Sequence, residues 1–101
     1  MKTQIKNISF TKGDTYSFKV TLVNSELDIN GATLTVKDNT EKIIFTKELD
    51  NGIVKQDNSF IVTIKPADTR DLNATIQYTY DLELNYGTDD TFTPVKGLFE
   101  I

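Results

Sequence analysis

Apolar and polar residues alternate along most of this chain with a period of two. That period is typical of β-strands with one buried face, because successive side chains of a strand point to opposite faces. The clearest case runs from Ile76 to Tyr86. One face carries Ile76, Tyr78, Tyr80, Leu82, Leu84 and Tyr86, and the other carries Gln77, Thr79, Asp81, Glu83 and Asn85. We therefore predict a strand here with Tyr80 largely buried at its centre.

The same alternation predicts strands over most of the remaining chain. In chain order they are a lead strand around Ile5, Ile8 and Phe10, then residues 15–23, a strand around Leu34 and Val36, residues 43–45, 53–56, 59–65, 76–86 and 91–101. These strands leave few residues for segments with the 3.6-residue period of helices, so the pattern favours an all-β fold.

Turn residues separate the predicted strands. Glycine at Gly13, and the pairs Asn30-Gly31 and Asn51-Gly52, suit tight turns because these residues tolerate a positive φ. In the last strand, Val95, Phe99 and Ile101 share one parity while Phe92 and Pro94 take the other. A change of parity next to a proline predicts a β-bulge or an edge position near Pro94.

Apart from the short lead strand, there are about seven antiparallel strands with this pattern, which indicate an immunoglobulin-like β-sandwich. In such folds the segment before the sixth strand crosses between the sheets, often through a short turn of helix, and the sequence PADTRDLN at 66–73 has suitable turn residues. Tyr78, just inside the next strand, is a candidate corner tyrosine whose hydroxyl bonds back to that loop. The alternative is a plain core aromatic with its hydroxyl at the sheet rim.

Length and composition agree with one globular domain over residues 1–101. The chain has 38% hydrophobic and 26% charged residues, and it contains neither cysteine nor histidine. The chain therefore cannot form disulfides or thiolate metal sites, and a zinc site is disfavoured. No cofactor is expected.

The formal net charge of −4 argues against nucleic acid as a partner, because phosphate backbones are usually bound by clustered lysine and arginine. No apolar run approaches the ~18 residues of a membrane span, and the first ten residues have no apolar stretch of signal-peptide length. We expect a protein made in the cytoplasm that has no membrane partner.

Without histidine or cysteine, an enzyme would need a carboxylate pair for general acid and base work. The three candidate pairs are Asp81 with Glu83, Asp68 with Asp71, and Asp89 with Asp90. Asp81 and Glu83 are better explained as a solvated charge ladder facing Lys37 and Lys96 on neighbouring strands. Asp68, Arg70 and Asp71 fit loop bracing. We expect no catalytic residues.

The tip YGTDDT lacks the spacing of a calcium loop, so Asp89 and Asp90 fit ordinary hairpin chemistry better than a metal site. The scattered glycines have no phosphate-binding spacing. Tyr86 and Phe92 flank this tip and are the candidate contacts for a glycan or a partner, although packing within the hairpin also explains them. The outward residues Val23, Ile44 and Ile61 point to a face covered by another subunit.

Five segments, taken in order, resemble a known group of proteins. They are FTKGDTYSFKVTL, LDINGATLTVKD, FIVTIKPADTRDL, YTYDLEL and the closing GLFEI. They are similar to the small immunoglobulin-like domains of tailed-phage and prophage structural proteins, including the N-terminal domain of phage baseplate upper proteins. The matching positions are Gly13 to Thr15, Asp28 to Thr33, Ala67 to Thr69, Tyr78 to Leu84, and Gly97, Phe99 and Ile101.

The resemblance implies a structural role in tail or baseplate assembly within the virion. Its implied partners are other phage structural proteins and further copies of the chain. It supplies no catalytic residues. Baseplate upper proteins continue beyond such a domain, whereas this sequence stops at Ile101, so a small virion component and an N-terminal module both remain open. The alternative function is an adhesive or glycan-binding module for the bacterial cell surface, with Tyr86 and Phe92 as contacts.

Overall fold

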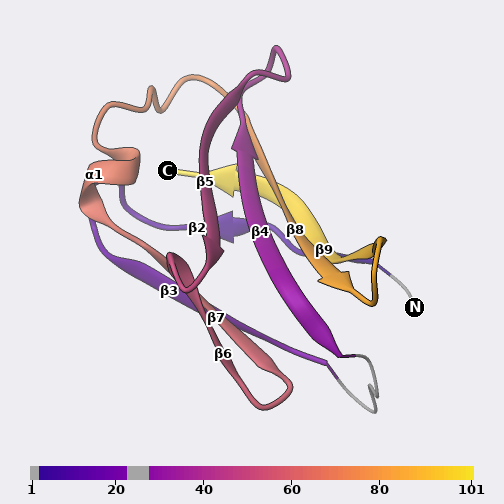
Figure 1. The fold of residues 1–101 in the computed structure, drawn as a ribbon. Coiled ribbons are helices and arrows are strands. Elements are labelled where there is room, and N and C mark those ends of the chain that lie inside the picture. Colours follow the sequence, from indigo (N-terminus) through magenta and orange to yellow (C-terminus); the bar gives the residue numbers. More distant parts are fainter. Residues whose placement is uncertain (1–2, 23–27) are drawn as a thin grey trace.

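The computed structural model describes residues 3–22 and 28–101, and they form nine strands and one turn of helix (Figure 1). The strands are β1 (Gln4–Ile5), β2 (Ile8–Ser9), β3 (Tyr16–Thr21), β4 (Ile29–Lys37), β5 (Ile43–Leu49), β6 (Gly52–Gln56), β7 (Ser59–Ile64), β8 (Tyr78–Tyr86) and β9 (Asp90–Glu100). The helix α1 covers Pro66–Thr69. The predicted all-β class is confirmed, and the short helical turn lies in the segment where one was expected.

The strands form one curled sheet in the order β1-β9-β8-β4-β5-β6-β7-β3, and β2 also pairs with β9. Most ladders are antiparallel, including the long ones that join β8 to β4 and to β9. Three are parallel: β1 and β2 both run parallel to β9, and β5 meets β6 over a short parallel ladder. The sheet is therefore mixed rather than wholly antiparallel.

The curl brings distant strands into contact through one apolar core. Leu34, Val36, Ile53, Phe60, Val62, Ile64, Leu82 and Leu84 are all fully buried. The Phe18 ring of β3 meets the Tyr80 ring of β8 edge to face at 6.0 Å, and Phe45 of β5 meets Phe99 of β9 at 5.8 Å. Burying these side chains supplies the main favourable free energy of folding.

The parity predicted for 76–86 is confirmed from Tyr78 to Leu84, whereas Asn85 and Tyr86 are both half-buried. Tyr80 is 3% exposed, and the buried and exposed positions of β8 alternate from Tyr78 to Leu84. The strand itself begins at Tyr78, because Ile76 lies in the preceding turn.

One predicted turn is wrong. Asn30 and Gly31 lie inside β4, where the register against β8 shifts between Ile29 and Gly31. A β-bulge accommodates the pair within the strand, so the local preference of Asn-Gly for a turn is overridden by pairing with β8. The turns at Gly13 and near Asn51-Gly52 are confirmed, with φ of 87° at Gly13 and 99° at Gly52.

The bulge expected near Pro94 is also confirmed. Leu82 of β8 lies opposite Val95 and Leu84 lies opposite Phe92, so Glu83 faces two residues of β9, Thr93 and Pro94. An extra residue on one strand is the definition of a bulge, and it places Pro94 where its missing N–H is tolerated.

Candidate functional site

Two of the motif segments meet at the start of β3. The Gly13 N–H donates to the Thr69 hydroxyl at 3.0 Å, and the Lys12 ammonium donates to the Leu72 carbonyl at 3.1 Å. Thr69 is fully buried although polar, and this bond satisfies its hydroxyl oxygen. The turn at Gly13 to Thr15 and the loop that contains Ala67 to Thr69 thus hold one another in place.

Asp68 braces the same loop from the other side. Its carboxylate accepts the Lys65 N–H at 2.7 Å, and its Oδ2 lies 2.6 Å from the Lys47 ammonium of β5. The carboxylate therefore closes the first turn of α1 and ties that turn to the sheet. Asp68 has the loop-bracing role predicted for it, whereas Arg70 and Asp71 are exposed beside it.

The Tyr78 hydroxyl accepts the Asn73 N–H at 3.0 Å, five residues upstream. Because the ring is only 4% exposed, the bond fixes the loop against the core. Tyr78 thus makes the bond expected of a corner tyrosine.

Tyr80 reaches in a different direction. Its hydroxyl donates to the Lys6 carbonyl at 2.6 Å, which ties β8 to the segment between β1 and β2. Desolvation by burial, with a smaller effect from the neighbouring Tyr16, raises the pKa of Tyr80 to about 12. The hydroxyl therefore stays protonated and remains a donor at neutral pH.

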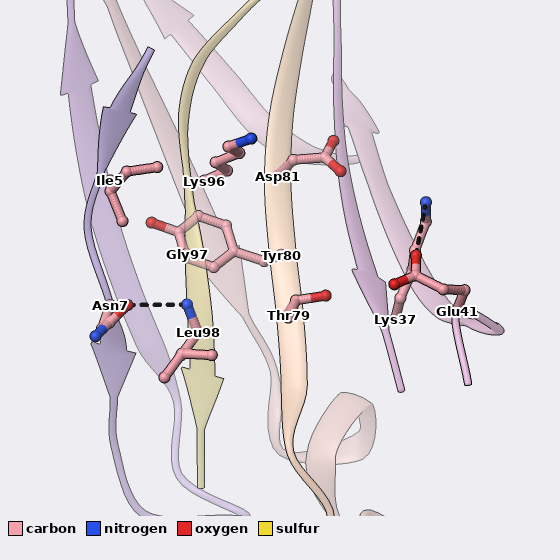
Figure 2. A pocket seen from close by; sticks show the side chains of 10 residues that line it. All are labelled: Ile5, Asn7, Lys37, Glu41, Thr79, Tyr80, Asp81, Lys96, Gly97 and Leu98. Atoms are coloured by element: carbon pink, nitrogen blue, oxygen red, sulfur yellow. Dashed lines mark hydrogen bonds and ion pairs between the residues drawn. The ribbon is translucent and has the colours of Figure 1, made fainter. Parts of the chain in front are cut away.

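A shallow groove of about 320 Å³ lies beside the bond between Tyr80 and Lys6. It crosses β1, β9, β8 and the end of β4 (Figure 2). Ile5 and Leu98 supply apolar surface, and Ile5 is 69% exposed. Gly97 lies on its floor, where the Lys6 backbone passes so close that a Cβ would collide with the Lys6 carbonyl oxygen. The Asn7 side chain accepts the Leu98 N–H at 3.0 Å and so ties the segment between β1 and β2 to β9 along the groove.

The charges around the groove balance. Lys37 lies 3.9 Å from Glu41, and Asp81 is the cross-strand partner of Lys96. Among the described residues the ion pairs are Lys37–Glu41 and Lys47–Asp68. The predicted charge ladder is therefore wrong in part: Asp81 lies opposite Lys96 without a close ion pair, and Lys37 lies opposite Thr79 rather than an acid. Two acids and two bases beside an apolar strip suit an uncharged or amphipathic contact better than an ion.

Sequence reasoning missed this groove because it depends on the parallel pairing of β1 and β2 with β9. One signal was present in the lead strand. Ile5 is at an odd position while Ile8 and Phe10 are at even ones, and such a change of parity marks a kink between them. In the structure the break between β1 and β2 falls at Lys6 and Asn7.

The two aromatic residues at the β8–β9 hairpin pack against each other. The Tyr86 and Phe92 rings meet edge to face with centroids 5.9 Å apart, and both side chains are half-buried. The Asn30 amide donates to the Gly87 carbonyl at 2.8 Å and braces the tip from β4. The hairpin-packing interpretation thus accounts for these contacts, and the remaining exposed ring surface is the candidate glycan or partner contact.

Other predicted positions are scattered. Asp89 and Asp90 are both exposed at the tip, and residues 3–22 and 28–101 contain no group of three or more acidic side chains able to hold a metal ion. Ile44 is half-buried and packs against the core, so the prediction that it faces outward is wrong. Ile61 is half-buried on β7, and Val23 lies outside the described residues. No helix in the described part of the chain is long and apolar enough to cross a membrane.

Comparison with known proteins finds no matching family model and no match among curated proteins. In the structure the motif residues Gly13, Thr69, Tyr78 and Gly97 all make packing or hydrogen-bonding contacts.

Proposed function

We propose that the curled sheet is an immunoglobulin-like sandwich. One layer would consist of β1 and β2, β9, β8, β4 and β5, and the other of β6, β7 and β3. Three features support this division: the short ladder between β5 and β6, the contact of Phe18 with Tyr80, and the bond from Asn73 to the Tyr78 hydroxyl. Such a sandwich presents sheet faces and edges to partners.

We propose that the protein is a non-catalytic structural module of a phage or prophage tail or baseplate. The observation that carries this proposal is the placement of the motif residues. Residues of these motifs build the scaffold: Gly13 bonds to Thr69, and Gly97 leaves room for the Lys6 backbone, whose carbonyl accepts a hydrogen bond from Tyr80. In these contacts the residues serve the scaffold rather than a reaction, and the assignment to an assembly part comes from the resemblance.

The chemistry of the groove supports the same proposal. Its apolar strip and balanced charges suit a protein surface, and the chain has no histidine or cysteine with which to activate a substrate. We propose that the partners are other virion proteins and further copies of this chain, in a particle assembled in the bacterial host. Attachment need not be strong at each contact, because a symmetric ring makes it multivalent.

The test is to purify particles from an induced host strain and to search them for this chain by mass spectrometry. We expect the chain to sediment with intact tails. Its absence from particles would contradict the assembly proposal.

A glycan array on the free protein tests the adhesive alternative. The assembly proposal expects at most millimolar binding to cell-wall saccharides. Micromolar binding that Tyr86→Ala or Phe92→Ala removes would favour the adhesive function, with the hairpin aromatics as its site.

A further inference from the structure

Strand β3, from Tyr16 to Thr21, ends the sheet. It pairs with β7 through an unbroken ladder from Tyr16↔Ile64 to Thr21↔Ser59, and no other described strand pairs with it. In an antiparallel ladder every second residue turns its N–H and C=O away from its partner. One edge of β3 therefore presents a row of backbone donors and acceptors, and the strand has no proline or bulge that would block pairing.

The inward side chains of β3 are incompletely covered. Tyr16, Phe18 and Val20 are each half-buried, while Phe60, Val62 and Ile64, their partners on β7, are fully buried. The rings of Phe10 and Tyr80 cover Tyr16 and Phe18 in part, by stacking at 4.8 Å and by an edge contact at 6.0 Å. The core is thus open along β3, where one more strand would cover both the apolar row and the free backbone groups.

The opposite end of the sheet does not offer the same template. There the edge is divided into β1 and β2, which pair with β9 over two residues each. The Asn7 side chain occupies the break by accepting the Leu98 N–H. A short, interrupted edge is a usual protection against further pairing.

We infer that β3 pairs with β3 of a second copy of this chain, antiparallel and across a two-fold axis. A two-fold contact uses the same patch on both subunits, and an antiparallel strand edge is complementary to itself. This inference deepens the proposed assembly role by naming one contact and its partner. It rests on the proposed function only for its place in a particle, because the pairing itself belongs to the isolated protein.

Charge selects the register. Residues facing the same side must pair with one another, so the registers that use most of β3 centre either on Phe18 or on Lys19. The second places two lysines directly opposite each other, which destabilises a ladder. The register centred on Phe18 instead places Lys19 opposite Ser17 of the partner subunit and brings the two Phe18 rings together, so that they cover one another's exposed sides.

The interface is small. A single strand pair with a short apolar row belongs below about 1,200 Å² of buried surface, the range of weak and transient contacts. We therefore expect a dimer in the micromolar to millimolar range of concentration. Such a contact gains strength when other contacts hold the subunits in one particle.

The test is sedimentation equilibrium of the purified chain and its variants over a range of concentrations. Ser17 is exposed and faces Lys19 of the partner in the inferred register, so Ser17→Lys creates two lysine pairs per dimer and Ser17→Glu creates two ion pairs. Two such cross-strand pairs together change the dissociation constant by about tenfold. We expect Ser17→Lys to weaken the dimer and Ser17→Glu to strengthen it by that factor.

A charge exchange and a distant control complete the design. Ser17→Lys combined with Lys19→Glu restores opposite charges across the axis and should recover the dimer. Gln56→Lys adds the same charge to an exposed site on β6, two strands from the edge, and should leave the dissociation constant unchanged. Circular dichroism melting of each variant establishes that it is folded.

A monomer at every concentration up to about 1 mM would overturn the inference, and so would a dimer that Ser17→Lys leaves unchanged. A monomeric chain that is nonetheless found in purified tails would reject this contact and retain the assembly proposal. If the chain forms the expected dimer but is absent from tails, the β3 contact is retained and the assembly proposal is rejected.

Discussion

Tyr78 and Tyr80 lie two positions apart on β8, and each hydroxyl ties the strand to a different segment. Tyr78 accepts the Asn73 N–H from the preceding loop, whereas Tyr80 donates to the Lys6 carbonyl of the N-terminal segment. Both rings also fill the core. At the scale of single residues, therefore, the same side-chain type serves packing and long-range connection together.

Replacing Tyr80 with aspartate tests the assignment of the two faces of β8. Tyr80→Asp places an unpaired carboxylate in the core, and we expect it to lower the free energy of unfolding by more than about 3 kcal/mol. Thr79→Asp lies on the exposed face opposite Lys37 and should cost much less. Thermal melting measures both variants, and equal shifts would contradict the assignment.

Removing only the Tyr80 hydroxyl tests its role as a buried donor. Tyr80→Phe leaves the Lys6 carbonyl without this partner, and we expect a loss of about 1 kcal/mol at neutral pH. Because burial raises the pKa of Tyr80 from 10.0 to about 12, the unfolded chain loses this proton first. The stabilisation is therefore complete below pH 10 and is lost as the pH rises from 10 towards 12.

Denaturant titrations of wild type and Tyr80→Phe between pH 8 and 12 measure this dependence. The variant should lack the Tyr80 part of the alkaline decline, so the two curves should converge as the pH rises. Parallel curves over the whole range would show that the hydroxyl is not buried as described.

At the scale of elements, the N-terminal segment depends on one glycine. Gly97 lets the Lys6 backbone pass close enough for the Tyr80 bond and for the bond from Lys6 N–H to the Lys96 carbonyl at 2.9 Å. Gly97→Ala pushes the segment away from β9. We expect a loss of about 2 kcal/mol from overpacking and broken bonds.

Gly31→Ala is the matched control, because a Cβ there meets the Asn85 side chain, with Oδ1 at 2.9 Å, rather than backbone. A side chain can move where a strand cannot, so this variant should be the more stable of the two in urea. Amide hydrogen exchange of residues 4–9 should accelerate in Gly97→Ala alone. Equal losses of stability with unchanged exchange would contradict the role of Gly97.

Elements with a regular period were predictable from the sequence, because burial of one face dictates the alternation. This holds for β8 and for the inward row Phe60, Val62 and Ile64 of β7, and a break in the same period located the bulge at Pro94. The Asn30-Gly31 turn was wrong because local turn preference gave way to pairing with β8. The parallel pairing could not be predicted, because the alternation of side chains along a strand is the same whether its neighbour runs parallel or antiparallel.

The candidate site was less predictable than the elements. Tyr86 and Phe92 were correctly placed beside one hairpin, because neighbouring strands bring their ends together. The groove at Ile5 and Leu98 joins residues from both ends of the chain, and only the parallel ladder to β9 brings them together. A site of this kind depends on long-range register, about which alternation carries little information.

At the scale of the whole molecule, the sheet has two unlike ends. The β3 edge is regular and incompletely covered, whereas the β1 and β2 edge is short and closed by Asn7. An asymmetric sheet of this kind can pair at one edge without growing into a continuous fibre, because a two-fold contact closes on itself. This property suits the proposed role in a particle with a fixed number of subunits.

The most direct test of that role is the copy number of the chain in purified tail particles. Quantitative mass spectrometry with isotope-labelled reference peptides gives the ratio of this chain to the major tail proteins across independent preparations. The assembly account predicts a constant ratio that corresponds to several copies per particle and persists after high-salt washing. A ratio that varies between preparations, or falls to zero on washing, would contradict it.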